Sequence, residues 1–156
     1  MLKIGGKIPA LTLEGYQNDK IKKFSLAKYK GKWLILIFYP GDFTFICPTE
    51  LEETAGLYSE FKKLGAELMS VSTDTVYVHK AWHDASPAIK KVKFPMLADP
   101  NGKLSKELGT YIEDEGVSLR GSFIFDPDGA LKMFEIHHND IGRSGKELLR
   151  KLQAAK

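Results

Sequence analysis

The sequence has 156 residues, 43% of them hydrophobic and 28% charged, and its 23 basic residues outnumber its 20 acidic residues by three. This length fits one domain with a single core, and the scattered basic residues give no sign of a nucleic-acid-binding surface. The longest apolar run, residues 33–39, is too short to span a bilayer, and the N-terminus lacks the apolar segment of a signal peptide. The only cysteine, Cys47, excludes an internal disulfide framework and fits a reducing compartment, so we expect a cytoplasmic protein without a membrane segment.

Apolar runs and turn residues predict strands alternating with helices. Residues 33–39 (WLILIFY) are apolar without alternation, which is typical of a strand covered on both faces. The patterns that follow predict, in order, a helix from 48 to 64, a strand over 66–74, a helix over 76–84, a short helix over 103–108, a hairpin of 120–125 with 131–136, and a helix over 146–153. This order is that of an α/β thioredoxin-like fold with a mixed central sheet, here in one domain over residues 1–156 with an N-terminal extension over residues 1–30.

Cys47 lies where the first predicted strand gives way to a helix, directly before Pro48. Proline is favoured at the first helical position, so Cys47 is expected at or near the N-cap. Free backbone N–H groups and the positive end of the helix dipole favour an anion there, and a thiolate is such an anion. Thr44 can offer its hydroxyl to the sulfur from three residues earlier. These features favour a reactive thiolate over a buried structural cysteine.

Acidic residues in the same helix oppose a thiolate, although they also stabilise the helix N-terminus; they are Glu50, Glu52 and Glu53. No lysine or arginine lies between positions 32 and 62, so an offsetting cation has to arrive through tertiary contact. Arg120 and Arg143 are the candidates. They are two of only three arginines in the chain, and a planar guanidinium binds carboxylates in a way that lysine cannot reproduce.

Residues 40–47, PGDFTFIC, match the Pro-x-x-x-Thr-x-x-Cys signature of peroxiredoxins. The longer stretch FYPGDFTFICPTEL resembles the typical two-cysteine branch of that family, of the bacterial alkyl hydroperoxide reductase C type. Four further segments, at 70–82, 94–109, 120–129 and 140–144, resemble the same branch in the same order. The resemblance therefore covers nearly the whole chain.

The resemblance implies a thiol-dependent peroxidase that reduces hydrogen peroxide and alkyl hydroperoxides through a sulfenic acid at Cys47, without a cofactor. It assigns the roles residue by residue: Thr44 and Arg120 hold the thiolate and the peroxide oxygens, Pro40 shields the sulfur from water, Glu50 and Arg143 orient Arg120, and Trp82 lines the rim of the site. The implied partners are a hydroperoxide substrate, a thioredoxin-like or flavoprotein disulfide reductant, and copies of the same chain. A homodimer would assemble into a decamer-type ring, with Phe43 near a subunit contact.

The sequence departs from that branch in two ways. Typical members carry a resolving cysteine in a C-terminal tail, whereas this sequence stops at Lys156 with no second cysteine. The chain is therefore either a truncated two-cysteine enzyme, which the matched segments favour, or a one-cysteine enzyme that relies on an external thiol. The Gly-Gly-Leu-Gly insertion of hyperoxidation-sensitive relatives is also absent from residues 86–94, which implies an enzyme that resists conversion of Cys47 to sulfinic acid.

Two other functions remain open from the residues alone. A cysteine hydrolase would need a histidine near Cys47, and His79 or His137 are candidates. A ring-forming holdase chaperone would depend on apolar surface rather than on the thiol. The paired histidines, His79 with His83 and His137 with His138, are expected on the solvated surface and not at a metal site, because neither a thiolate nor a catalytic glutamate accompanies them.

Overall fold

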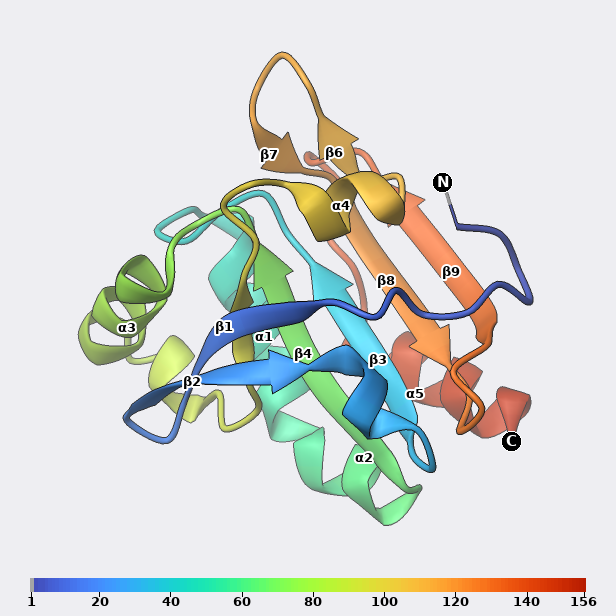
Figure 1. Ribbon diagram of the computed structural model, residues 1–156. Helices are drawn as coiled ribbons and strands as arrows, with labels where there is room; N and C mark the ends of the chain where they lie inside the picture. Colours follow the sequence, from blue (N-terminus) through green and yellow to red (C-terminus); the bar gives the residue numbers. More distant parts are fainter. Residues whose placement is uncertain (1) are drawn as a thin grey trace.

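A computed structural model describes residues 2–156 and contains a seven-stranded mixed sheet (Figure 1). The strands run in the order β2-β1-β5-β4-β3-β8-β9, and a separate two-stranded hairpin is made by β6 and β7. The strands are β1 (Thr12–Gln17), β2 (Lys20–Ser25), β3 (Trp33–Phe38), β4 (Ala66–Ser72), β5 (Met96–Ala98), β6 (Tyr111–Ile112), β7 (Val117–Ser118), β8 (Arg120–Phe125) and β9 (Leu131–His137). The predicted α/β class with a mixed sheet is confirmed.

Helices cover both faces of the sheet. They are η1 (Leu26–Tyr29), α1 (Ile46–Gly56), α2 (Tyr58–Lys63), α3 (Val76–Ala85), η2 (Ile89–Lys91), α4 (Lys103–Glu107) and α5 (Gly145–Ala155), where η marks a 3-10 helix. Side chains from α1, α2, α3 and α5 pack in one core cluster, and side chains from the N-terminal segment, η1 and α4 pack in a second cluster. None of the helices in residues 2–156 is both long and apolar enough to cross a membrane.

The strand β3 separates the two clusters because successive side chains of a strand point to opposite faces. Ile35 and Ile37 belong to the cluster with α1, whereas Leu34 and Leu36 belong to the cluster with α4. Both faces are therefore apolar, which explains the continuous hydrophobic run in the sequence.

Three predictions about the elements were incomplete. The helix expected over 48–64 is two helices, because the chain leaves helical geometry at Leu57 (φ −100°, ψ 0°). The N-terminal extension contains the β1–β2 hairpin, which pairs with the sheet through β5 and was not predicted. The short β6–β7 hairpin was also missed.

The register of the sheet brings two distant segments together at the carboxyl end of β3. Strand β8 is antiparallel to β3, and Gly121 pairs with Phe38. Arg120 therefore lies beside the point where the chain leaves β3 toward Cys47. The strand order places this arginine near the thiol although 73 residues separate the two in sequence.

Candidate functional site

Cys47 lies in the first turn of α1, and its side chain is completely buried. Cys47 is close to the N-cap as expected: the capping residue is Phe45, the helix begins at Ile46, and Cys47 is the second helical residue. Pro48 is the third helical residue and not the first, as the sequence had suggested. Phe45 offers no side-chain cap. Cys47 still lies among the first backbone N–H groups, which have no partner within the helix, so the positive end of the helix dipole acts on its sulfur.

Arg120 contacts the sulfur directly. Its Nη1 donates to Cys47 Sγ at 3.1 Å and to Glu50 Oε1 at 2.6 Å, and its Nε donates to the backbone oxygen of Asn139 at 2.9 Å. Its side chain is only 3% exposed. A buried guanidinium with three fixed contacts presents its positive charge to the sulfur in one orientation, so a charged donor lies where negative charge on the sulfur would be stabilised.

Glu50 joins the two arginines expected near the thiol. It lies one helical turn after Cys47, and its Oε2 accepts from Arg143 Nε at 3.0 Å while its Oε1 accepts from Arg143 Nη2 at 3.1 Å. Arg143 also donates to the backbone oxygen of Gly121 at 2.7 Å. Burial raises the pKa of Glu50, but its hydrogen bonds to Arg143 and the charges of both arginines outweigh burial and leave that pKa below its ordinary value of 4.5. Glu50 is therefore held as a carboxylate.

Thr44 and Pro40 lie in the loop that joins β3 to α1. Thr44 is exposed, and its hydroxyl donates to the backbone oxygen of Gly41 at 2.9 Å rather than to Cys47. Between them, Phe43 adopts φ +58°, a left-handed conformation that is uncommon outside glycine. The predicted roles of Thr44 and Pro40 toward a substrate remain predictions.

The structure corrects the expectations for Trp82 and for two of the histidines. Trp82 is not at the rim but buried at 2% exposure, where its ring packs 5.9 Å from that of Tyr39 and 6.2 Å from that of Phe43. His79 is completely buried rather than solvated, because its neighbours one turn away on either side pack into the core. His83 is half-buried, and its Nε2 lies 3.0 Å from the backbone oxygen of Val92. The pair near the end of β9 is more exposed, with His137 half-buried and His138 exposed.

The sequence did not predict a polar cluster that lies next to the loop joining β3 to α1. Within residues 2–156, Asp42, Asp74 and His79 place one oxygen or nitrogen ligand atom each within 4.8 Å of one another. These atoms are already bonded within the protein: Tyr39 donates to Asp42 at 2.6 Å, and His79 contacts both Asp42 and the backbone of Leu97. Asp42 in the PGD turn was the available signal, but an aspartate in a turn is ordinarily explained by the turn itself.

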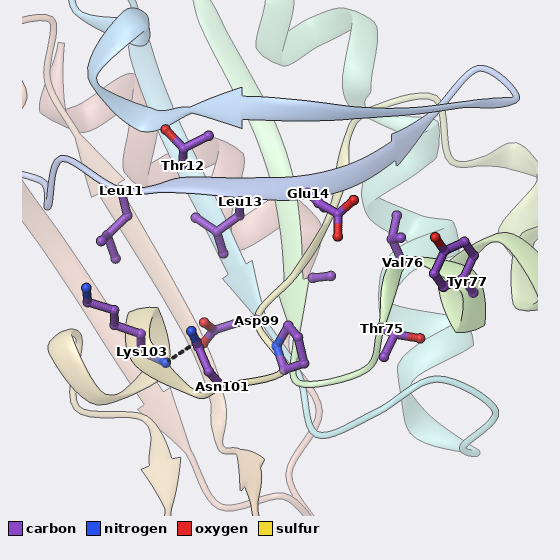
Figure 2. A pocket seen from close by; sticks show the side chains of 12 residues that line it. Leu11, Thr12, Leu13, Glu14, Thr75, Val76, Tyr77, Asp99, Asn101 and Lys103 are labelled. Atoms are coloured by element: carbon purple, nitrogen blue, oxygen red, sulfur yellow. Dashed lines mark hydrogen bonds between the residues drawn. The ribbon is translucent and has the colours of Figure 1, made fainter.

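A groove elsewhere on the molecule, with a volume of about 290 Å³, is separate from Cys47 (Figure 2). It lies between β1, the start of α3 and the loop after β5. Three of its polar side chains have structural partners: Thr75 caps α3, Asp99 accepts from the backbone of Ser105 at 2.8 Å, and Asn101 accepts from the backbone of Lys103 at 3.0 Å. The groove contains none of the predicted site residues.

Comparison with known proteins agrees with the geometry of the site. Residues 4–134 match the AhpC/TSA family. The alkyl hydroperoxide reductase C of Pseudomonas aeruginosa (strain UCBPP-PA14) is 44% identical over 152 residues, which cover 97% of this chain and 81% of the relative. The protein of the same name from Escherichia coli (strain K12) is 41% identical with the same coverage.

Solved structures of proteins with related names also match this chain. The crystal structure of Enterococcus faecalis AhpC matches with a TM-score of 0.97 at 44% identity, covering 99% of this chain and 93% of that one. The reduced 2-Cys peroxiredoxin of Plasmodium vivax matches with a TM-score of 0.92 at 31% identity, covering 97% of this chain and 80% of that one. These matches confirm the thioredoxin-like peroxiredoxin fold and the resemblance found in residues 40–47.

Proposed function

The chain belongs to the AhpC/TSA family, and from that premise we propose that it is a peroxiredoxin that reduces hydrogen peroxide and alkyl hydroperoxides. The observation that carries the proposal is the 3.1 Å contact between Arg120 Nη1 and the sulfur of Cys47 in the first turn of a helix. A thiolate is a strong nucleophile, and the weak O–O bond of a peroxide is a suitable target because a thiolate can displace one of its oxygens directly.

In the proposed reaction, the Cys47 thiolate attacks one oxygen of ROOH. A sulfur–oxygen bond forms, the O–O bond breaks, and the electron pair leaves on the second oxygen as an alkoxide that takes up a proton to give ROH. The sulfur is oxidised to a sulfenic acid while the peroxide is reduced. Arg120 and the backbone N–H groups of the first turn stabilise the negative charge as it moves from sulfur to the leaving oxygen.

The other predicted residues support this step from outside the reacting atoms. Glu50 and Arg143 hold the guanidinium of Arg120 in place through the contacts described above. Thr44, whose hydroxyl is exposed, would turn from Gly41 to the bound peroxide, and Pro40 would limit the access of water to the sulfur. We propose no cofactor and no metal for the reaction.

The partners follow from the chemistry. Cys47 is the only cysteine in this sequence, so a thiol outside these 156 residues must reduce the sulfenic acid. We propose that electrons come from a thioredoxin-like protein or a flavoprotein disulfide reductase in the cytoplasm. We also propose that residues 1–156 act as one domain in a homodimer that forms a decamer-type ring, a proposal supported by the exposed rings of Phe43 and Phe45.

A single-turnover experiment tests the function. Reduced protein treated with one equivalent of hydrogen peroxide should consume the oxidant and form one sulfenic acid per chain. Trapping with dimedone followed by peptide mass spectrometry should place the adduct on Cys47. Protein that leaves the peroxide intact under these conditions would contradict the proposal.

Replacing Arg120 with methionine tests its part in the step. The variant keeps most of the side-chain length but removes the donor to the sulfur, so the rate constant for peroxide reduction should fall by about 10²–10³, as for loss of a transition-state donor. Stopped-flow measurement of sulfenic acid formation gives the rate. Arg150→Met is the matched control, because Arg150 pairs with Glu147 on the exposed face of α5. Equal rates for the two variants would refute a role for Arg120.

A further inference from the structure

Arg120 is held from two sides, and one of them involves a residue that the proposed reaction does not use, Asn139. On the first side, Glu50 Oε1 accepts from Arg120 Nη1 at 2.6 Å. On the other side, Arg120 Nε donates to the backbone oxygen of Asn139 at 2.9 Å. One contact alone would let the planar guanidinium pivot, whereas contacts on two different nitrogens fix its orientation. The direction in which Nη1 faces Cys47 Sγ therefore depends on where the Asn139 carbonyl lies.

Asn139 lies beyond the part of the sheet that backbone pairing holds in register. Arg120 and His137 are the terminal pair between β8 and β9. Strand β8 begins and β9 ends on the side of the sheet that carries the β6–β7 hairpin (Figure 1). If the antiparallel register continued by two residues, Asn139 would stand opposite Ser118, the last residue of β7. The backbone pairing of β8 with β9 therefore does not itself hold the Asn139 carbonyl.

The side-chain amide of Asn139 supplies a contact in place of that pairing. Its Nδ2 donates to the backbone oxygen of Ser118 at 3.3 Å. The two segments are thus bonded reciprocally, because the side chain of Arg120 reaches the backbone at position 139 and the side chain of Asn139 reaches the backbone at position 118. We call these two bonds the Asn139 clamp. Two reciprocal bonds fix position and orientation together, as they do in a capping box at the start of a helix.

Both sides of the Asn139 clamp are fastened to the rest of the fold. Ser118 is buried, and its hydroxyl is hydrogen-bonded to that of Thr110, also buried, at 2.8 Å. On the other side, the chain turns directly after Asn139, and the backbone N–H of Ile141 donates to the backbone oxygen of His138 at 2.9 Å. The carbonyl of Asn139 is therefore confined between a buried strand end and a closed turn.

The remaining polar atom of the amide makes the clamp suitable for substitution. Oδ1 of Asn139 is buried and has no hydrogen-bond partner among residues 2–156. The carbonyl of Ser118 can only accept, so the amide cannot be turned round to exchange its nitrogen and oxygen. Replacing Asn139 with leucine removes one bond together with one unpaired buried oxygen. The free energy of unfolding should therefore change little.

We propose that Asn139 is a positioning residue for Arg120, and that the Asn139 clamp sets the direction in which the guanidinium faces Cys47. The effect on peroxide reduction rests on the proposed function. The side chain of Asn139 is bonded to Ser118 and not to the sulfur, so the residue acts through Nε of Arg120. Glu50 compensates the charge of the guanidinium, whereas Asn139 is neutral and contributes direction alone.

Asn139→Leu tests the proposal. The second-order rate constant for oxidation of Cys47 by hydrogen peroxide should fall by about tenfold, because a misdirected donor stabilises the transition state less well. The midpoint of urea unfolding should stay close to wild type. Asn101→Leu is the matched control: the amide of Asn101 also makes a bond to the backbone, with Lys103 at 3.0 Å, but it lines the groove that is separate from Cys47. Its rate constant should stay within about twofold of wild type.

A double-mutant cycle with Arg120→Met separates positioning from a general disturbance of the site. If Asn139 acts through Arg120, adding Asn139→Leu to Arg120→Met should change the rate constant by less than about twofold. A further loss of about tenfold in the Arg120→Met background would overturn the proposal, and so would a folded Asn139→Leu with a rate constant within about twofold of wild type. If Asn139→Leu does not fold, Asn139→Ala takes its place in the cycle.

Alkylation of Cys47 by iodoacetamide gives a readout that needs no peroxide. A guanidinium aimed at the sulfur stabilises negative charge there, so Asn139→Leu should slow alkylation at neutral pH and should add nothing to the effect of Arg120→Met. Faster alkylation would mean that the substitution merely exposes the sulfur, and it would contradict the proposal. Failure of wild type to react with peroxide, with the alkylation rates as expected, would refute the proposed function and still support the Asn139 clamp.

Discussion

Replacing Cys47 with serine should abolish peroxide reduction, with a loss of at least about a thousandfold in the rate constant. The serine hydroxyl stays protonated near neutral pH, so it is a poor nucleophile even beside Arg120. The serine hydroxyl also cannot form an intermediate equivalent to the sulfenic acid. Of the two atoms, only sulfur can accept the peroxide oxygen and then be reduced again by a thiol. Consumption of hydrogen peroxide with a dithiol reductant measures the effect.

The serine substitution changes little else, which makes the result interpretable. The side chain is nearly isosteric, and its hydroxyl can still accept from Arg120 Nη1, so circular dichroism and the thermal unfolding midpoint should stay close to wild type. Peroxide consumption that persists in a folded Cys47→Ser variant would show that the thiol is not the reactive group. Loss of ester hydrolysis in that variant, with no reaction of wild type with peroxide, would indicate a cysteine hydrolase instead.

The structure argues against the hydrolase. Within residues 2–156, the hydrogen-bond partner of Cys47 Sγ is Arg120 and not a histidine. Both ring nitrogens of His79 are engaged with Asp42 and Leu97, and His137 Nε2 lies 3.3 Å from Glu135. A cysteine hydrolase needs an imidazole that can take the proton of the thiol and return it, and no histidine in the part of the chain that the structure describes is hydrogen-bonded to Cys47 Sγ.

The strands and helices around the site were predictable from local patterns, whereas the burial of His79 was not. The spacing of His79 and His83 indicates only that they share a helix face. The position of Val76 and Trp82, three residues to either side of His79, already placed that residue within an apolar stripe. A polar residue in such a stripe is buried only if another element supplies partners, and Asp42 and Leu97 come from elements that no local pattern connects to α3.

The N-terminal hairpin shows the opposite case, in which a local signal existed and was overlooked. Asn18 and Asp19 both adopt positive φ and form the two-residue turn between β1 and β2. Asparagine and aspartate tolerate this conformation better than other residues with a side chain, so the pair marks a tight hairpin. The strands themselves were hard to recognise because β2 is an exposed edge strand rich in lysine, with little apolar alternation.

Arg120 and Arg143 are an intermediate case, because the sequence identified these residues but not their positions. Their scarcity in a lysine-rich chain suggested a site that needs a planar guanidinium, and the structure brings both Arg120 and Arg143 to Glu50. Their convergence depends on the antiparallel register of β8 with β3 and on the segment before α5. Composition could therefore nominate the residues but could not place them.

Glu50 holds two buried positive charges, so its replacement with glutamine should be strongly destabilising. The side chains of Glu50, Arg120 and Arg143 are at most 7% exposed. Glutamine keeps the shape but removes the charge that compensates both guanidinium groups, and breaking a buried ion pair from one side costs about 3–5 kcal/mol. Urea unfolding measures the loss as a lower midpoint with an unchanged slope.

Glu52→Gln is the matched control. Glu52 lies on the same helix and pairs with Lys91 at 2.6 Å, the same distance as the Glu50–Arg120 contact, but its side chain is 42% exposed. An exposed pair contributes at most about 1 kcal/mol, so Glu52→Gln should be nearly neutral. Equal effects of the two substitutions would show that the buried network is not what stabilises this end of α1.

The pH dependence of the difference in unfolding free energy between wild type and Glu50→Gln identifies the negative charge of Glu50 as the cause of that difference. The pKa of Glu50 is lowered in the folded protein, so its contribution to stability is present above the ordinary value of 4.5 and is lost as the pH falls through the lowered pKa. The gap in unfolding free energy between wild type and Glu50→Gln should therefore narrow as the pH drops below that value. A gap that stays constant in acid would mean that shape rather than charge accounts for the loss, and Glu50 would then not be the anion that holds Arg120 against the thiolate.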